Sequence, residues 1–200
     1  IILGLGIQGK KRKKFLKNDF FAFVDPYNNE AEYAHIEDVP LNKYDAVLAC
    51  VPDKAKLKIL EYCIKYNKHI LIEKPLIFKQ KRKILELEKK AISNKTFVYV
   101  AYNHRFEPHI INMKKLLEKK EIGKIYYCKM FYGNGTSKLI NKSSWRKKDS
   151  TGVITDLGSH LLDICNYWFG QNIGDFRLSS FNHFETRTVD HAILINDYKA

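Results

Sequence analysis

The chain has 200 residues, of which 45% are hydrophobic, and a formal net charge of +13. This length and composition are sufficient for one or two domains with real cores and exclude global disorder. No apolar run approaches the roughly 20 residues of a membrane-spanning helix. The lysines are spread along the chain without a recognisable nucleic-acid-binding motif. We therefore expect neither a membrane nor a nucleic acid as partner, and a surface whose charge attracts an anionic substrate.

Strand and helix patterns alternate over the first half of the chain. We predict strands over 1–6, 20–25, 44–52, 69–75 and 96–103. Between them we predict helices over 10–17, 56–67 and 81–92. Such alternation is typical of an α/β fold in which a doubly wound parallel sheet is covered by helices. We assign this Rossmann-type domain to residues 1–103.

The pattern changes in the second half, which we assign to an α+β domain over residues 104–200. A helix is predicted over 108–121, and an aromatic-rich strand over 123–135. A further helix over 155–170 is followed by strands near 176–182 and 188–197. Because the last pattern stops at the chain end, we expect an incomplete open mixed sheet and a fragment of a longer protein.

The sequence "GLGIQG" places Gly4, Gly6 and Gly9 in G-x-G-x-x-G spacing between a predicted strand and a predicted helix. Such glycines permit a tight turn, approach of a pyrophosphate to the backbone, and close packing of helix on strand. Asp25 ends the next strand, where a carboxylate can accept hydrogen bonds from ribose hydroxyls and would repel a 2′-phosphate. We predict NAD rather than NADP, although the basic residues 10–12 keep NADP open. The alternative is a glycine-rich turn in an unrelated α/β protein.

The sequence "HILIEKPL" places Glu73, Lys74 and Pro75 at the carboxyl end of a predicted strand. Ligands bind at this edge of open α/β sheets. A lysine there can donate to a substrate oxygen or stabilise a nearby anion. The alternative is a strand-end lysine that is exposed to water.

The predicted helix from Thr155 to Gly170 carries two neighbouring stripes of side chains. The apolar stripe consists of Leu157, Leu161, Ile164 and Trp168. The polar stripe consists of Asp156, His160, Asp163 and Tyr167. At the border of a buried face, a carboxylate can hold an imidazole and tune its pKa. The alternative is a solvated face on which Asp156 and His160 form a weak i, i+4 pair.

The four cysteines, at positions 50, 63, 128 and 165, have no metal-binding spacing. Cys50 and Cys165 lie in apolar patterns and are expected to be small core residues. Unpaired core cysteines fit a reducing compartment. We therefore expect a cytoplasmic protein without a metal site.

Together these motifs resemble the Gfo/Idh/MocA oxidoreductases, which include glucose–fructose oxidoreductase and inositol dehydrogenase. The resemblance extends to "FVDP", "YDAVLACVPDKAK", "YNHRFEP" and "SSWRKKDSTGVITDLGSHLLDICNYWFG", in family order over roughly residues 1–170. It implies a Rossmann domain followed by a domain whose open sheet mediates oligomers. It also implies a homo-oligomer at full length and a truncated member in this chain.

The resemblance implies roles for particular residues. The catalytic residues would be Lys74, Asp156 and His160. The substrate-binding residues would be Asp163, Arg146 and Asn103, with the loop over 133–150 lining the pocket. The cofactor-binding residues would be Gly4, Gly6, Gly9, Asp25, Pro52, Glu73, Lys74, Arg105 and Trp145. One departure is that Asp53 and Lys56 replace a common asparagine and histidine, which puts cofactor contacts of that loop in doubt.

The function implied is an NAD-dependent dehydrogenase that acts on a hydroxyl carbon of a sugar, nucleotide sugar or cyclitol. His160 would be the general base, Asp156 or Asp163 would stabilise its imidazolium, and Lys74 would stabilise the alkoxide. This mechanism requires Lys74 and His160 to converge on the reactive carbon of the nicotinamide. Two alternatives remain: a non-catalytic NAD-binding regulatory relative, and a redox-neutral NAD-dependent enzyme that cleaves glycosides.

Overall fold

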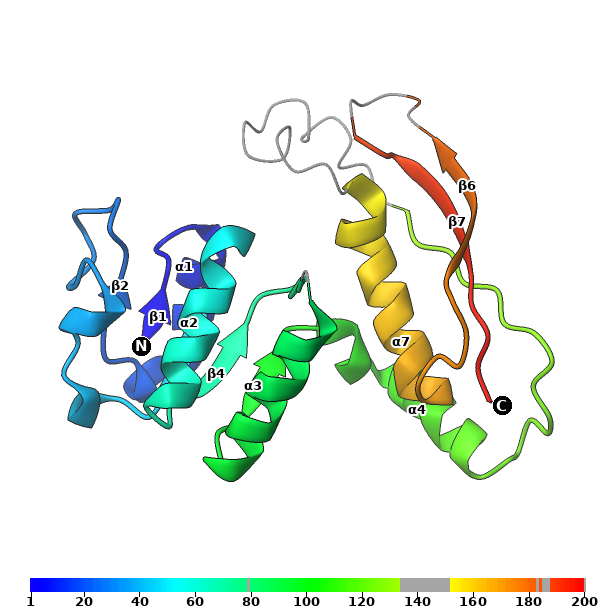
Figure 1. Cartoon of the computed structure of the whole chain (residues 1–200), viewed down its shortest axis with the longest axis horizontal. Helices are drawn as coiled ribbons and strands as arrows, with labels where there is room; N and C mark the ends of the chain where they lie inside the picture. Colours follow the sequence, from blue (N-terminus) through cyan, green and yellow to red (C-terminus); the bar gives the residue numbers. More distant parts are fainter. Residues whose placement is uncertain (79, 134–151, 183, 185–187, 200) are drawn as a thin grey trace. The chain divides into compact units, whose positions relative to one another are not determined.

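The structure is a computed structural model that describes residues 1–78, 80–133, 152–182, 184 and 188–199. Its contacts divide the chain into two units, residues 1–101 and residues 102–200 (Figure 1). The sequence pattern had indicated a boundary after residue 103. Within the described part of the chain, none of the helices combines the length and apolar character needed to cross a bilayer.

The first unit is built on a five-stranded parallel sheet with the strand order β2-β1-β3-β4-β5. Its strands are β1 (Ile2–Leu3), β2 (Phe23–Val24), β3 (Ala46–Ala49), β4 (His69–Ile72) and β5 (Val98–Val100). The helices of this unit are α1 (Ile7–Leu16), α2 (Asp53–Lys65) and α3 (Lys81–Ser93). Short 3-10 turns span Lys17–Asp19, Ile36–Asp38 and Leu41–Lys43. The predicted doubly wound parallel sheet is thus confirmed.

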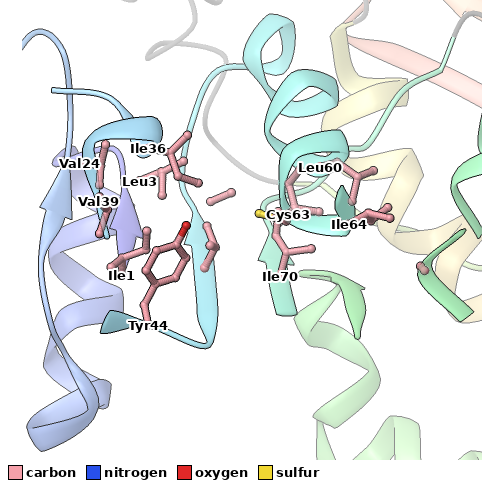
Figure 2. Packing of buried hydrophobic residues seen from close by; sticks show 14 of the residues in the cluster. Ile1, Leu3, Val24, Ile36, Val39, Tyr44, Leu60, Cys63, Ile64 and Ile70 are labelled. Carbon is pink, nitrogen blue, oxygen red and sulfur yellow. The ribbon is translucent and has the colours of Figure 1, made fainter. Parts of the chain in front are cut away.

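The core of the first unit lies between the sheet and its helices (Figure 2). The strands contribute apolar side chains such as Val47 and Ile72, both fully buried. Helix α2 presents Leu60, Cys63 and Ile64 to the same cluster at helical spacing. These side chains fix α2 against the sheet, and with it the loop that enters α2 from β3.

The described residues of the second unit form helices and an antiparallel strand pair. It begins with the 3-10 turn η4 (Asn103–Phe106), followed by α4 (Pro108–Glu118). The π-helical turn η5 (Ile154–Gly158) leads into α7 (Ser159–Phe169). Strands β6 (Arg177–Asn182) and β7 (His191–Ile195) lie where the sequence predicts strands, and they pair antiparallel.

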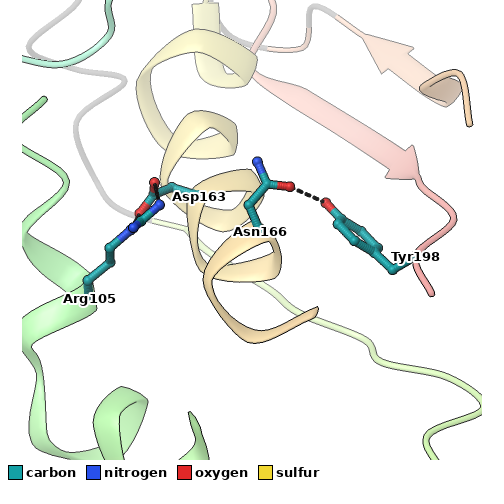
Figure 3. Close-up of polar contacts among 4 residues, drawn as sticks. All are labelled: Arg105, Asp163, Asn166 and Tyr198. Atoms are coloured by element: carbon teal, nitrogen blue, oxygen red, sulfur yellow. Dashed lines mark hydrogen bonds and ion pairs between the residues drawn. The ribbon is translucent and has the colours of Figure 1, made fainter. Parts of the chain in front are cut away.

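Helix α7 is held by a contact with α4 and by a contact with the segment after β7. The indole N–H of Trp168 donates to the carbonyl oxygen of Ile110 in α4 at 3.0 Å. On the other side, the Tyr198 hydroxyl donates to Oδ1 of Asn166 at 3.2 Å (Figure 3). These contacts fix the rotation of α7 about its axis, and therefore which side chains it buries.

The predicted strand over 123–135 is wrong for the described residues 123–133, which form no strand. Aromatic residues favour strands because they fit a paired, half-buried pleated surface. Here Tyr126, Tyr127 and Phe131 are 85%, 81% and 90% exposed. Without a neighbouring strand in the described part of the chain, their propensity alone does not create a strand.

The predicted regular helix over 155–170 is also interrupted. In η5 the hydrogen bonds close over one residue more than in an α-helix, which shifts the side chains around the axis. Asp156 and Leu157 lie in this turn, whereas His160, Asp163 and Tyr167 lie in α7 and keep the predicted spacing. The spacing from Asp156 to His160 therefore crosses the junction between the π-helical turn and α7.

Candidate active site

The glycine loop connects β1 to α1, and its three glycines differ in the room that they leave for a side chain. Gly4 has a φ of +91°, and a Cβ there would lie 2.4 Å from the carbonyl oxygen of Cys50. A Cβ on Gly9 would lie 1.9 Å from the carbonyl oxygen of Gly4. By contrast, a Cβ on Gly6 would meet no atom within 4 Å. Two of the glycines are thus required by the fold, and Gly6 leaves open space beside the N-terminus of α1.

Asp25 follows β2, and its carboxylate is fixed by two backbone groups. Its Oδ2 accepts from the N–H of Leu5 at 2.8 Å, and its Oδ1 accepts from the N–H of Tyr27 at 2.9 Å. Each carboxylate oxygen can still accept another hydrogen bond. The acid therefore holds the glycine loop and can also bind the hydroxyls of a ribose.

The glycine loop lies at the switch point of the sheet. Strand β1 has β2 on one side and β3 on the other, so the connections run in opposite directions from it. Open α/β sheets bind ligands at the carboxyl ends of such strands. Cys50 leaves β3 there, and the exposed Pro52 precedes α2 as its N-cap. The predicted cofactor residues of this unit gather at this edge.

Glu73 follows β4 and is paired with Arg12 of α1. Its Oε1 accepts from Nη2 of Arg12 at 2.6 Å and from Nε at 3.1 Å. Glu73 was predicted to contact the cofactor, and Arg12 was considered only as a basic residue near a phosphate. The neighbouring Cys50 is half-buried, and burial, followed by the charge of Glu73, raises the pKa of its thiol to about 11.

Lys74 is half-buried and directly follows this pair. On its other side, the carbonyl oxygen of Pro75 accepts from Nζ of Lys56 at 2.8 Å. Lys56 is buried, with 3% of its surface exposed, and its ammonium also pairs with Oδ1 of Asp53 at 2.6 Å. The two residues that depart from the family pattern, Asp53 and Lys56, therefore form an ion pair that also contacts Pro75, the residue after Lys74.

In the second unit, α7 buries the polar stripe as deeply as the apolar one. His160 is 6% exposed and Asp163 is 8% exposed, close to the 7% and 5% of Leu157 and Ile164. A buried ionisable side chain is costly unless it is paired, so these positions are not a solvated face. The alternative of a weak surface pair does not apply to His160.

Within the part of the chain that the structure describes, three aromatic rings contact the imidazole of His160. The ring centroids of His104, Tyr102 and Tyr132 lie 4.4, 5.7 and 6.1 Å from that of His160. All three contacts are edge-on rather than stacked. Burial is the main reason that the pKa of Tyr102 is raised. We call this group the His160 aromatic cluster.

The members of this cluster were not predicted from the sequence. Asn103 and Arg105 were selected from "YNHRFEP", whereas Tyr102 and His104, the alternating residues of the same segment, contact His160. Asn103 is exposed. The two aromatic rings of this segment, next to residues already predicted for the site, were the signal that could have identified them.

Asp163 and Arg105 were predicted to bind substrate and cofactor, and the structure pairs them with each other. Nε and Nη2 of Arg105 donate to Oδ2 and Oδ1 of Asp163, each at 2.6 Å (Figure 3). The guanidinium also lies 5.3 Å from the ring centroid of Tyr167. This bidentate pair joins η4 to α7 and neutralises the charge of Asp163.

The remaining predicted residues fall elsewhere. Trp145 and Arg146, with most of the predicted pocket loop, lie outside the described residues. Asp156 is half-buried in η5. Among the described residues, no group of three or more His, Cys, Asp or Glu side chains could hold a metal ion.

The residues at the carboxyl edge fit a dinucleotide. The backbone at Gly6 is open beside the N-terminus of α1, which is the kind of position where helices bind phosphate groups, and Asp25 can accept hydrogen bonds from a ribose. A parallel sheet with this loop at its switch point defines a dinucleotide-binding protein of the Rossmann class.

Comparison with known families agrees with this class in both units. Residues 3–102 match the model of the GFO/IDH/MocA oxidoreductase family, NAD-binding Rossmann fold, and residues 110–199 match the GFO/IDH/MocA C-terminal domain. The chain belongs to the GFO/IDH/MocA oxidoreductase family and contains its NAD-binding Rossmann domain. The resemblance seen in the sequence is thus confirmed.

Individual relatives include dehydrogenases. The scyllo-inositol 2-dehydrogenase (NADP(+)) IolW of Bacillus subtilis is 25% identical over 84% of this chain and 48% of its own length. The glucose-6-phosphate 3-dehydrogenase of the same organism is 26% identical over 66% of this chain and 39% of its own length. The chain thus spans less than half the length of either relative.

A solved structure shows the same fold. An oxidoreductase from Agrobacterium radiobacter, in complex with NAD+, L-tartaric acid and magnesium, matches with a TM-score of 0.77. The match covers 99% of this chain and 62% of that chain, at 17% identity. At this identity the comparison supports the fold alone.

The glycine loop allows a test with a matched control. We expect Gly9→Ala to lower the free energy of unfolding by about 3 kcal/mol or more, because its Cβ would overlap a backbone oxygen. Gly6→Ala should cost no more than about 1 kcal/mol and should weaken NAD binding about tenfold or more, because its Cβ would occupy the pyrophosphate space. Urea unfolding and NAD titration measure both effects. Equal destabilisation by the two substitutions, or unchanged NAD affinity in Gly6→Ala, would contradict this assignment.

The cysteines should differ in reactivity according to burial. Burial raises the pKa of Cys50 and Cys165 to about 11 and that of Cys63 to about 12, so their thiolates are scarce at neutral pH. At pH 7.5, iodoacetamide should modify the exposed Cys128 at least about tenfold faster than these three. Raising the pH toward 11 should accelerate modification of Cys50, because its thiolate fraction grows as the pH approaches its pKa. Peptide mass spectrometry measures the rates, and modification of Cys50 at the rate of Cys128 would contradict the expectation.

Proposed function

We propose that the protein containing this chain is an NAD-dependent dehydrogenase that oxidises a secondary hydroxyl of a cyclitol or sugar. The family is an oxidoreductase family with an NAD-binding domain. Its relatives include enzymes named for inositol and for glucose 6-phosphate. NAD, when bound, supplies the hydride acceptor, and the side chains of the protein supply proton transfer and charge stabilisation.

The observation that carries the proposal is the environment of His160. A titratable imidazole is buried on α7, where an apolar side chain would pack at no electrostatic cost. The His160 aromatic cluster restrains its ring, which is what a general base of fixed orientation needs. We propose that a nitrogen of this imidazole accepts the proton of the substrate hydroxyl.

The two acids on this helix receive different roles in the proposal. Both oxygens of Asp163 already accept hydrogen bonds from Arg105, which neutralises its charge. We therefore assign stabilisation of the imidazolium to Asp156. Asp163 and Arg105 form a rigid polar pair one helical turn beyond His160, a position from which they can orient substrate hydroxyls.

Lys74 receives the role of stabilising the developing alkoxide. It lies at the carboxyl end of β4, the edge at which open α/β sheets bind their ligands. An ammonium group placed near an alkoxide favours its formation through charge. The proposed reaction requires Lys74 and His160 to act on the same hydroxyl.

We propose NAD rather than NADP as the working cofactor. A carboxylate at position 25 repels a 2′-phosphate, and the guanidinium of Arg12, which could have attracted one, pairs with Glu73. The net charge of +13 favours an anionic substrate, such as a phosphorylated sugar. The relative that acts on glucose 6-phosphate is in keeping with that class.

A substrate panel on the full-length protein tests the proposal. Inositols, free sugars, sugar phosphates and nucleotide sugars are supplied with NAD or NADP, and reduced cofactor is followed by absorbance. We expect net NADH formation with at least one member. Bound NAD without any reduction across the panel would favour a regulatory protein, and glycoside cleavage without net NADH would favour a redox-neutral enzyme.

A further inference from the structure

Each sequence neighbour of Lys74 accepts a hydrogen bond from a cationic side chain. Glu73, immediately before it, is held by Arg12 through two hydrogen bonds of 2.6 and 3.1 Å. Pro75, immediately after it, is held at its carbonyl oxygen by Lys56 at 2.8 Å. Arg12 belongs to α1 and Lys56 to α2, so two separate helices of the same unit hold the residues on either side of one lysine, Glu73 by its side chain and Pro75 by its backbone.

These contacts act at the point where the hydrogen bonding of the sheet ends. Strand β4 ends at Ile72, and the N–H of Glu73 donates to the carbonyl oxygen of Ala49 at 3.0 Å. Beyond that hydrogen bond, the direction of the chain at Lys74 depends on what holds its neighbours. Side-chain contacts at Glu73 and Pro75 therefore determine where the Lys74 ammonium can reach.

The burial of Lys56 indicates that its hydrogen bond to Pro75 has a structural role, since a lysine that serves only solubility would be exposed. Its side chain is 4% exposed, and removing an ammonium from water is costly unless it is paired and hydrogen-bonded. Asp53 provides the counter-charge at 2.6 Å, and the Pro75 carbonyl provides a second acceptor. An apolar residue could fill the same volume, but it could not hold that carbonyl.

Each contact is neutral in total charge. Arg12 is balanced by Glu73, and Lys56 is balanced by Asp53. The two pairs can therefore restrain the segment without adding net positive charge beside the Lys74 ammonium. This arrangement suits a lysine that must keep its own charge to stabilise an alkoxide.

We propose that Arg12 and Lys56 are positioning residues for Lys74, which fix its backbone through Glu73 and Pro75 so that its ammonium is directed at the substrate oxygen. This inference rests on the proposed function, because it presumes that Lys74 stabilises the alkoxide. A displacement of about 1 Å at a reacting group can cost on the order of 100-fold in rate. Loss of either contact should therefore lower kcat about 10-fold to 100-fold while NAD affinity changes little.

The test compares variants in two backgrounds of the full-length protein, using whichever substrate of the panel reduces NAD. Arg12→Met and Lys56→Met are made alone and together with Lys74→Met. A positioning role predicts that each substitution lowers kcat when Lys74 is present. It predicts no further loss of kcat when Lys74→Met is already in place, because the group being positioned is gone. Arg12→Lys should recover part of the loss.

Lys14→Met on α1 and Lys58→Met on α2 are the matched controls, since both lysines are exposed. Hydrogen exchange of the backbone amides around residues 73–78 gives a readout without substrate. It should accelerate in Arg12→Met and Lys56→Met and remain unchanged in the controls. If Lys56→Met does not fold, the half-exposed Arg12 allows the same comparison alone.

The outcomes separate this inference from the proposed function. If Lys74→Met leaves kcat unchanged, the role of Lys74 in the proposed function is wrong. If Lys74→Met lowers kcat but the contact variants add their full loss to it, Lys74 acts as proposed and the positioning role is overturned. Unchanged exchange around residues 73–78 would also overturn it.

Discussion

Replacing Lys74 with Met is expected to lower kcat about 100-fold or more in the full-length protein, with NAD affinity within about threefold of wild type. Methionine keeps most of the length of the side chain and removes its charge, so the lost rate reports alkoxide stabilisation rather than packing. Initial rates of NADH formation and NAD titration by fluorescence measure the two quantities.

Lys89→Met on α3 is the control for Lys74→Met, because Lys89 is an exposed lysine on the same unit. It should retain wild-type kcat and NAD affinity. A Lys74→Met enzyme that keeps wild-type kcat would remove Lys74 from the mechanism. A loss of NAD affinity as large as the loss of kcat would instead make Lys74 a cofactor-binding residue.

Replacing His160 with Asn is the second substitution with a large expected effect, again about 100-fold or more in kcat. Asparagine can donate and accept hydrogen bonds but cannot take up the hydroxyl proton. In wild type, kcat/KM should fall as the pH is lowered, because the protonated imidazole no longer accepts a proton. His160→Asn should lack this decline on the acid side. Initial rates across a pH series measure both effects.

The control for His160→Asn is His109→Asn, which changes an exposed histidine of α4. It should keep both the rate and the acid decline. Persistence of the acid decline in His160→Asn would assign it to another group, and His104, whose ring lies 4.4 Å from that of His160, is the first candidate. Its Nδ1 contacts Oε1 of Glu107.

The Rossmann unit was predictable because its signals are local. Only glycine fits at Gly4 and Gly9 without a backbone clash, and a carboxylate at position 25 bonds the glycine loop. These residues follow one another in a fixed order along the chain. The structure then supplies the reason for each one. The family match and the parallel sheet confirm this part of the sequence analysis.

The pairs that organise the site were not predictable, because their members are distant in sequence. Arg105 and Asp163 are 58 residues apart, and Arg12 and Glu73 are 61 apart. A motif identifies a charged residue near a site but does not identify its partner. All four residues were therefore given contacts with ligands, or were considered for them, whereas the structure pairs them with one another.

Helix α7 shows how far helical periodicity can be used. The spacing from His160 to Tyr167 was predicted correctly, since packing on one side of the helix fixes that register. The π-helical turn before it depends on the surroundings of the entering chain and has no signature in the spacing. The spacing alone also allowed a solvated polar face, so the burial of His160 did not follow from it, and the π-helical turn that holds Asp156 was not predicted.

The most direct test of the account follows the hydrogen at the oxidised carbon. The substrate identified by the panel is prepared with deuterium on its carbinol carbon, and the reduced cofactor is examined by mass spectrometry after one turnover of the full-length protein. The account predicts one deuterium in the NADH that forms. Turnover that leaves NADH unlabelled, or substrate binding to the NAD complex with no labelled cofactor at any time, would contradict it.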